Sequence, residues 1–378
     1  MADTTPVPLV SLFAEVDDPR RSQARLHALE DILLMATLAV ICGADSWTEV
    51  ELFGRQKQAW LETFLELPHG IPSHDTFGRV FARLDPHQLE GCFARWVQSL
   101  AAALQAQVVS VDGKAARRSH DAGRGVPALH LVGAWADAAR LVLGQQRVDD
   151  HSNEITAIPE LLEMLVLKGC IVTIDALGCQ KRIAQTIRDQ DADYVRALKG
   201  NQPQLHEAVV ETFAVEQAEG FEGCVHDFHQ TVNKDHGRIE TRRCWAIDTP
   251  EYIRYVDPEG AWPDLCSLVM IEAQRRQNEQ VVSETRYYIS SLPAEARALL
   301  QAVRSHWGVE NRLHWVLDMA FREDESRIRT GHAAHNMAIL RRLALNLLRR
   351  ETTAKGGIAA RRKQAGWNNG YLLKVLSN

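Results

Sequence analysis

The sequence lacks a hydrophobic run long enough to cross a membrane. Its longest apolar stretch, Ile32 to Ala44, has 13 residues, whereas a membrane-spanning helix needs about 20. The N-terminal residues contain neither a basic segment nor a following apolar stretch; this pattern predicts no signal peptide and a cytoplasmic location. The seven cysteines form no CxxC pair, which argues against a disulfide framework or a zinc site.

The rest of the composition is typical of a globular protein, with 378 residues of which 46% are hydrophobic and 24% charged. The net charge of −6 mildly disfavours a nucleic-acid partner, but the charge is unevenly distributed. Residues 327–378 contain 11 Lys or Arg and a single acid, which leaves a net charge of −16 on residues 1–326. Such a basic end either binds phosphates or is simply a solvated helix face and tail, and charge alone does not decide between the two. The candidate phosphate contacts in it are Arg341, Arg342, Arg349, Arg350, Lys355, Arg361, Arg362 and Lys363.

Residues 1–100 are predicted to be helical. The apolar segment 26–43 and the amphipathic segment 46–65 each have helical character. In the segment 70–84, Ser73 is a candidate N-cap for a helix that Pro86 stops, and a further helix is predicted over 88–104. Two short helices around a Gly-Ile-Pro turn fit a DNA-reading helix-turn-helix and fit a plain helical bundle equally well.

From residue 107 the hydrophobic period changes to that of an α/β fold. Strands are predicted over 108–113, 129–137, 139–148, 169–177 and 193–200, with one helix opened by Pro159 and another after the fourth strand. This order predicts a mixed sheet covered on both faces. Residues 203–292 predict a helix and then a β-rich inserted lobe, and helices resume at Glu295 and continue to about Arg350.

Two aspartates follow apolar strands. Asp112 ends the strand VVSV and Asp175 ends the strand IVTI, and ligands usually bind at strand ends in open α/β sheets. A carboxylate among apolar neighbours must be paired, protonated or bound to a cation. Oxygen donors of this kind suit magnesium. A turn residue or a helix cap remains an equally good interpretation of each aspartate.

A third candidate acid lies in the helical segment RSHWGVENRLHWVLDMAF. Glu310, His314 and Asp318 are spaced at i, i+4 and i+8 and therefore share one helix face. Acidic and imidazole groups aligned on a mostly apolar helix indicate a site, although this spacing alone favours an ordinary surface helix.

Several long strings now resemble a known family. VDGKAARRS (111–119), NEITAIPELL (153–162), TIDALGCQ (173–180), DYVRALKGNQ (193–202), HGRIETR (236–242) and HWGVENRLHWVLDMAFRED (306–324) resemble the H-repeat-associated proteins of the ISAs family of bacterial insertion-sequence DDE transposases. The resemblance runs from about residue 7 to the C-terminus, in the same order.

The resemblance implies an α/β, ribonuclease H-like catalytic core with a β-rich insertion, preceded by an all-α N-terminal domain. The boundaries that we expect are 1–105 for the helical domain, 106–350 for the catalytic domain with its insertion at about 203–292, and 351–378 for a basic tail. Asp112, Asp175 and Glu310 match the family's two catalytic aspartates and its final glutamate. They would hold two Mg²⁺ ions, for which Mn²⁺ can substitute, and cut and join phosphodiesters.

The resemblance also implies double-stranded DNA, both transposon ends and target, as the partner. A homodimer is expected because two ends must be paired, and neither a membrane nor a small-molecule substrate is expected. Where related transposases carry a Tyr and a Lys around the final glutamate, this chain has His306 and Leu317. The candidate DNA contacts are Lys114, Arg117, Arg118, Lys199, Asn201, Gln202, Arg238, Arg304, His306 and His314.

Single residues have competing interpretations. Asn153 caps the following helix or, with Glu154, adds a ligand, and capping is the simpler interpretation. Lys114 and its neighbours hold a phosphate or are exposed loop charges, whereas Arg238 binds DNA or pairs with Glu240. For the whole chain, the alternatives to a transposase are a catalytically silent, transposase-derived DNA-binding protein and a nuclease that cuts without joining.

Overall fold

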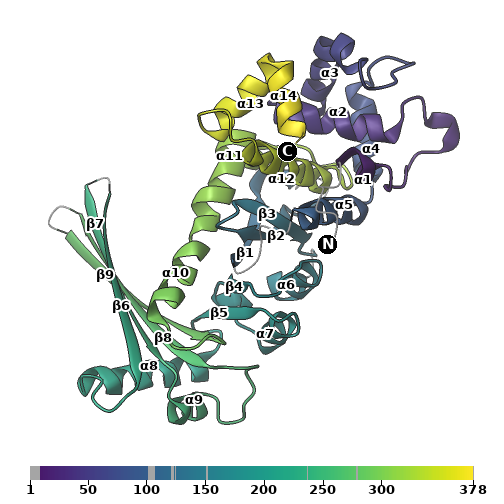
Figure 1. The fold of residues 1–378 in the computed structure, drawn as a ribbon. Coiled ribbons are helices and arrows are strands. Elements are labelled where there is room, and N and C mark those ends of the chain that lie inside the picture. The colour runs from purple at the N-terminus through teal and green to yellow at the C-terminus, as the bar shows by residue number, and fades with distance from the viewer. Residues whose placement is uncertain are drawn as a thin grey trace, which may run out of the picture.

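The computed structural model describes residues 9–100, 107–120, 123, 125–149, 152–235, 237–277 and 280–377 (Figure 1). The chain begins with a helical region, as predicted. Its α-helices are α1 (Leu9–Phe13), α2 (Leu29–Ile41), α3 (Trp47–Leu61), α4 (His74–Arg83) and α5 (Pro86–Ser99). None of the helices in the described ranges is long and apolar enough to cross a membrane.

Capping side chains set where these helices begin. Ser46 and Glu49 form a reciprocal capping box at α3, and Ser73 accepts a hydrogen bond from the backbone of Thr76 at α4. The predicted cap at Ser73 is therefore confirmed. Pro86 is the first residue of α5 rather than only a stop for α4, because Asp85 caps that helix and Pro suits its first turn. The predicted end of this helix, at residues 101–104, lies outside the described residues.

The central sheet has the predicted arrangement of strands. Its five core strands are β1 (Val108–Ala116), β2 (Leu129–Ala136), β3 (Leu141–Arg147), β4 (Ile171–Ile174) and β5 (Asp193–Leu198). They lie in the order β3-β2-β1-β4-β5. The first three strands are antiparallel to one another, whereas β1, β4 and β5 run parallel. The mixed α/β architecture predicted from the sequence is thus confirmed.

Helices cover both faces of these strands. Helices α6 (Glu154–Glu163) and α7 (Lys181–Arg188) lie on one side and α10 (Ala296–His306) on the other (Figure 1). Pro159 does not open α6, as the sequence had predicted, but lies inside it. The helix starts earlier because the side chain of Asn153 accepts a hydrogen bond from the Ile155 amide at 3.0 Å, which confirms the capping interpretation of Asn153.

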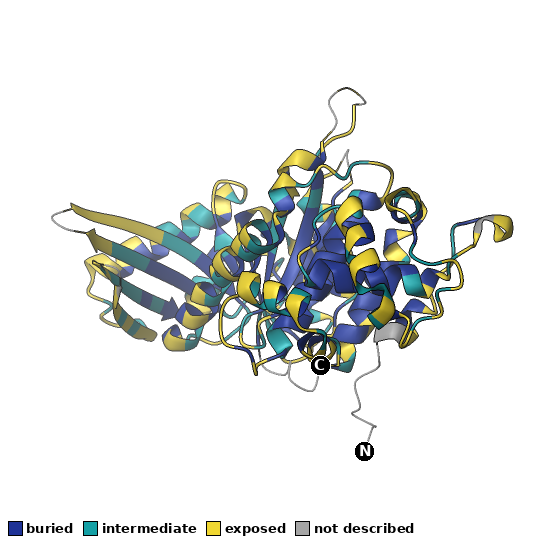
Figure 2. Cartoon of the chain, turned by 90° about the horizontal axis from the view of Figure 1, so that it is seen from above, coloured by how far each residue is buried: buried dark blue, intermediate teal, exposed yellow. Residues whose placement is uncertain are grey.

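The predicted β-rich lobe is an extension of the same sheet. It comprises α8 (Pro203–Ala218), β6 (His226–Asp235), β7 (Arg238–Ile247), α9 (Pro250–Val256), β8 (Ser267–Gln277) and β9 (Gln280–Ser290). Strand β9 pairs antiparallel with β5, so the nine strands form one sheet in the order β3-β2-β1-β4-β5-β9-β8-β7-β6. Figure 2 shows that the outer ends of these strands are largely exposed, in contrast to the buried core strands.

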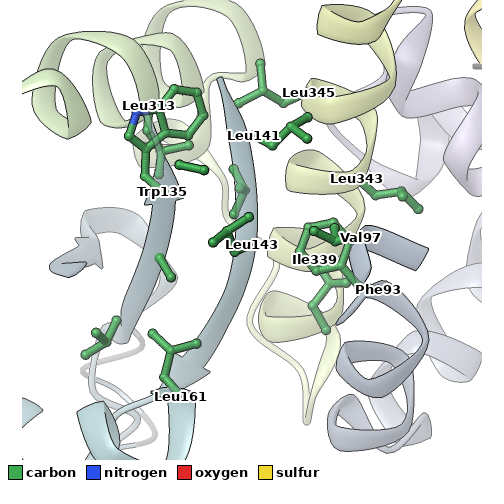
Figure 3. Close-up of a cluster of buried hydrophobic side chains, with 14 of the residues drawn as sticks. Phe93, Val97, Trp135, Leu141, Leu143, Leu161, Leu313, Ile339, Leu343 and Leu345 are labelled. Atoms are coloured by element: carbon green, nitrogen blue, oxygen red, sulfur yellow. The ribbon is translucent and has the colours of Figure 1, made fainter. Parts of the chain in front are cut away.

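The C-terminal part of the chain is helical to its end. After α10 come a π-helical turn (Glu310–His314), α11 (Trp315–Phe321), α12 (Ala333–Arg350), α13 (Ile358–Trp367) and α14 (Asn369–Leu376). Helix α12 packs against both the N-terminal helices and β3. Figure 3 shows this junction, where Phe93 and Val97 of α5 and Ile339 of α12 lie next to Leu143 of β3. The helical region and the sheet therefore share one hydrophobic core.

The basic C-terminal segment is not an extended tail. Arg341, Arg342 and Arg362, which the sequence offered as phosphate contacts, are each less than 5% exposed. Arg342 pairs with Glu323 at 2.8 Å, and Arg362 pairs with Asp45 at 3.2 Å. These three side chains are therefore enclosed within the protein and are not available to DNA.

Candidate active site

The register of two parallel strands brings Asp112 and Asp175 together. Val111 of β1 pairs with Ile174 of β4, and the next residue in the chain is an aspartate in each case. Asp175 directly follows β4 as predicted, whereas Asp112 lies inside β1 (Val108–Ala116) and does not end that strand, because β1 continues its antiparallel pairing with β2. Side chains alternate between the two faces of a sheet. Val109, Val111 and Ile174 belong to the core on the α6 and α7 side, which places both aspartates on the face covered by α10. Two residues that are distant in sequence thus become neighbours.

Glu310 reaches the same place from the helix that covers this face. Helix α10 ends at His306, and the π-helical turn Glu310–His314 follows. Glu310, Asp112 and Asp175 line one cavity of about 310 Å³ together with the exposed Lys199. A π-helical turn contains one residue more than an α-helical turn and is frequent at functional sites. The α-helical spacing assumed from the sequence is therefore interrupted at the glutamate itself.

The electrostatics of the cavity favour a cation. The pKa of Asp112 is raised to about 7, mainly by burial and also by the negative charges of Asp175, Glu154 and Glu310, against the opposing effect of a hydrogen bond from the Gly113 amide. A shift in this direction means that the site disfavours another negative charge. A positive ion next to Asp112 would offset both the burial of its carboxylate and the negative charges around it.

The donor atoms of the cavity fit a hard divalent cation. Three carboxylates supply the oxygen ligands that Mg²⁺ and Mn²⁺ prefer. Among the described residues, however, no group of three or more His, Cys, Asp or Glu side chains is arranged to hold a metal ion as it stands. The site therefore fits a divalent metal in two respects: its donor atoms are carboxylate oxygens, and the three acids line the same cavity. Their side chains, as they lie among the described residues, do not form a preformed metal cage.

Three side chains of the DYVRALKGNQ segment brace the turn that presents Asp175. Arg196 donates a hydrogen bond to the carbonyl of Gly178, Asn201 donates to that of Ala176, and Gln202 donates to that of Cys179 at 2.9 Å. Asp175 itself accepts hydrogen bonds from the Leu177 and Gly178 amides, both through Oδ1. The amides of Asn201 and Gln202, predicted to contact DNA, are thus engaged within the protein.

The charges next to Asp112 are also engaged. Lys114, predicted to hold a phosphate, is 11% exposed and lies 2.8 Å from Asp318 and 3.4 Å from Asp324. His314 Nδ1 lies 3.6 Å from Asp112 Oδ2. Burial lowers the pKa of His314 to about 4, helped by the charges of Lys114 and Arg342. The histidine is therefore neutral near pH 7 and does not neutralise Asp112.

The other predicted DNA contacts are spread over the surface around the cavity. Arg117 and Arg118 are exposed beyond the end of β1. Arg238 lies 3.3 Å from Glu240, in line with the pairing alternative. His306 lines the cavity, and its Nδ1 is 3.2 Å from the Thr173 hydroxyl. Arg304 faces a separate groove.

Two further residues lie close to Asp112: Glu154, which the sequence offered as a possible additional ligand, and His130, which the sequence did not place at the site. His130 Nε2 lies 2.8 Å from the Glu154 carboxylate, which rests directly against Gly113. A Cβ atom at position 113 would come within 1.9 Å of a carboxylate oxygen of Glu154. A larger residue at position 113 would therefore require the Glu154 carboxylate to move from its place beside Asp112. The one sequence signal for this packing is the glycine that follows the aspartate.

Comparison with known proteins agrees with the geometry. The family described as "Transposase DDE domain" matches residues 91–347, and the family described as "DDE_Tnp_1-associated" matches residues 10–97. The "Putative transposase YncI" of Escherichia coli O157:H7 is 40% identical over 98% of this chain and 94% of its own length. The "H repeat-associated putative transposase YhhI" of Escherichia coli K12 is 38% identical over 98% of this chain and 97% of its own length. The "Inactive transposase YbfQ" of the same strain is 39% identical over 18% of this chain and 79% of its own length.

Acids gathered on the helix-covered face of a mixed sheet are typical of the nucleic-acid-cutting class of proteins that use divalent metals. The matches to the two family models identify one family within this class. The chain belongs to the DDE transposase family, and its similarity to the H repeat-associated proteins confirms the resemblance drawn from the sequence.

Proposed function

We propose that this chain cuts DNA at the terminal repeats of an insertion sequence and joins the freed 3′ end to target DNA. The observation that carries the proposal is the placing of Asp112, Asp175 and Glu310, from three distant segments, on one cavity. The order β3-β2-β1-β4-β5 supports a ribonuclease H-like core, which family membership implies. We retain the domain limits 1–105, 106–350 and 351–378 as part of the proposal, with the last segment folded as helices.

In this mechanism Asp112, Asp175 and Glu310 would hold two Mg²⁺ or Mn²⁺ ions. The ions would supply activation of the attacking oxygen and stabilisation of the leaving oxygen at a phosphodiester. Asp175 is oriented through Oδ1 by its own turn, which in turn is held by Arg196, Asn201 and Gln202. Lys199 is exposed at the edge of the cavity and is placed to attract the phosphate of the DNA strand.

The partners that we propose are double-stranded DNA and a second copy of the chain that holds the other transposon end. The alternative is a transposase-derived DNA-binding protein without catalysis; the related YbfQ is named an inactive transposase. Retention of all three acids favours an active enzyme. A nuclease that never joins ends would share the same cavity.

The test is cleavage of DNA that carries the element's terminal repeats, in Mg²⁺ or Mn²⁺. We expect Asp112→Asn, Asp175→Asn and Glu310→Gln each to lower the cleavage rate by at least about a thousandfold while leaving DNA affinity within about threefold, because each removes a ligand charge and keeps the side-chain shape. A joining assay with labelled 3′ ends separates a transposase from a nuclease. Robust cleavage by all three variants would defeat the assignment.

A further inference from the structure

A second concave surface lies beside the candidate active site. It is a groove of about 440 Å³ between α10 and β6, to which Asp137 and Arg312 also contribute. It shares no residue with the cavity of the three acids. Leu300 is its only apolar side chain among the described lining residues. The groove therefore offers polar contacts and little of the apolar anchoring that a protein partner needs.

The charge of the groove is positive. Arg297, Arg304 and Arg312 line it, against one acid, Asp137. Arg312 Nη1 lies 2.7 Å from Asp137, which neutralises that acid. Arg297 and Arg304 are exposed and form no ion pair with any residue that the structure describes. Two arginines are thus left with donors for an anion.

Two more observations favour an anion in the groove. Partial burial lowers the pKa of Arg304, and the nearby charge of Arg242 also lowers it, against the opposing effect of Glu240, so a negative ligand would favour its charged form. The Oγ1 atom of Thr231 is buried at the wall of the groove without a hydrogen-bond partner among the described residues. A ligand with anionic oxygens would satisfy the arginines and this hydroxyl together.

The spacing of the arginines suits an extended ligand. Arg297, Gln301 and Arg304 are at i, i+4 and i+7 and share one face of α10. Seven residues at a rise of about 1.5 Å separate the two arginines by about 10 Å along the helix axis. One strand of a DNA duplex advances by about 3.4 Å per nucleotide along the duplex axis. On a duplex that runs parallel to α10, this span therefore corresponds to about three nucleotides.

Helix α10 separates the groove from the cavity. Val303, His306 and Trp307 line the cavity from another face of the same helix. With its side chains an α-helix is about 10–12 Å thick, which is close to the width of about 12 Å of the major groove of B-DNA. The groove is therefore within reach of a duplex that delivers a phosphodiester to the three acids, a few base pairs from that phosphodiester.

We propose that the groove between α10 and β6 binds the sugar–phosphate backbone of the duplex that is being cut, a few base pairs from the scissile phosphodiester. The inference rests on the proposed function. It assigns Arg297, Gln301 and Thr231 as backbone contacts beside Arg304. Figure 1 shows the setting, with α10 running next to the strands of the sheet extension.

The first test measures binding of a fluorescent duplex of about 30 base pairs by anisotropy, without divalent metal. Each lost phosphate contact should lower the slope of log affinity against log salt by about 0.9, which corresponds to about fivefold weaker binding at 0.15 M salt. We expect this for Arg297→Gln and for Arg304→Gln, and about thirtyfold for the double variant. Arg254→Gln, which removes the same charge from α9, is the matched control and should bind like the wild type.

Thermal unfolding checks that the variants are folded, and both arginines are exposed, so their Tm values should match the wild type. Binding of the double variant within twofold of the wild type would overturn the inference. Failure of the wild type to bind duplex DNA at all would instead overturn the proposed function.

The second test asks whether one duplex occupies both surfaces. The cleavage position on DNA that carries a transposon end is first mapped with the wild-type protein. Two shortened duplexes are then made, each of which ends about two base pairs beyond that position, one on the first side of it and one on the other. On one of the two shortened duplexes the penalty of the double variant should fall from about thirtyfold to below twofold, because the contacted phosphates are gone. If the double variant lost about thirtyfold in affinity on both shortened duplexes, the groove would bind a different DNA molecule from the one being cut, and this would contradict the proposal.

Discussion

At the scale of residues, the sequence motifs serve two different purposes. Asp112, Asp175 and Glu310 line the cavity, whereas Arg196, Asn201 and Gln202 hold the backbone turn behind Asp175. Residue types alone could not separate these roles, because an amide that contacts DNA and an amide that braces a turn look the same in a sequence. The hydrogen bonds of Arg196, Asn201 and Gln202 to backbone carbonyls distinguish the two roles.

Gln202 provides a test of this bracing role. Gln202→Met keeps the side-chain volume and removes the N–H donor to the Cys179 carbonyl, which costs about 1 kcal/mol of stability. We expect the cleavage rate to fall by about tenfold or more at unchanged DNA affinity, since small misplacements of reacting groups are costly. Gln204→Met, two residues further on at an exposed position, is the control. Equal rates for both variants would show that the turn needs no brace from Gln202.

At the scale of elements, the sequence predicts most of the sheet and fails where local signals compete. Strands β1 to β5 were predicted because their apolar runs are bounded by clear turns. The sequence predicted that Pro159 starts a helix, because Pro favours a first turn. The cap at Asn153, six residues after the end of β3, sets the start instead. The pairing of β9 with β5 is a long-range contact, so no local pattern announced that the lobe continues the sheet.

The candidate site was predicted to a similar extent. The sequence predicted that Asp112 and Asp175 each end a strand and lie close together. The parallel pairing of β1 with β4 does bring them together, but only Asp175 follows the end of its strand, and Asp112 lies inside β1. The π-helical turn at Glu310 was not predicted, because a hydrophobic spacing near 3.6 describes an α-helix equally well. The contact of Glu154 with Gly113 depends on how α6 packs against the sheet, and the glycine that follows Asp112 is the one sign of it in the sequence.

At the scale of the whole molecule, the C-terminal helices link the helical region to the catalytic sheet. Arg362 of α13 donates hydrogen bonds to the Val40 carbonyl at the end of α2, and α12 packs against α2 and β3. From sequence alone, deletion of residues 351–378 would have been expected only to weaken DNA binding. The structure indicates that it also removes part of the core.

We therefore expect a chain truncated after Arg350 to unfold at a Tm lower by at least about 5 °C. The truncation removes buried apolar side chains such as Leu372 and Val375 and exposes the apolar groups against which they pack. Differential scanning calorimetry measures this. The charge of the segment is tested separately by Lys355→Gln and Lys363→Gln, both at exposed positions, which should leave Tm unchanged. A truncated chain as stable as the full one would mean that α13 and α14 add nothing to the fold.

The central claim is that Asp112, Asp175 and Glu310 together hold divalent cations. The most direct measurement is an anomalous difference map from crystals of the wild-type protein soaked in Mn²⁺. The account predicts peaks in the cavity within about 2.0–2.6 Å of carboxylate oxygens of these three residues, the distances that hard divalent cations adopt. Mn²⁺ bound by other residues, with the cavity empty in crystals of a protein that cleaves DNA, would contradict it.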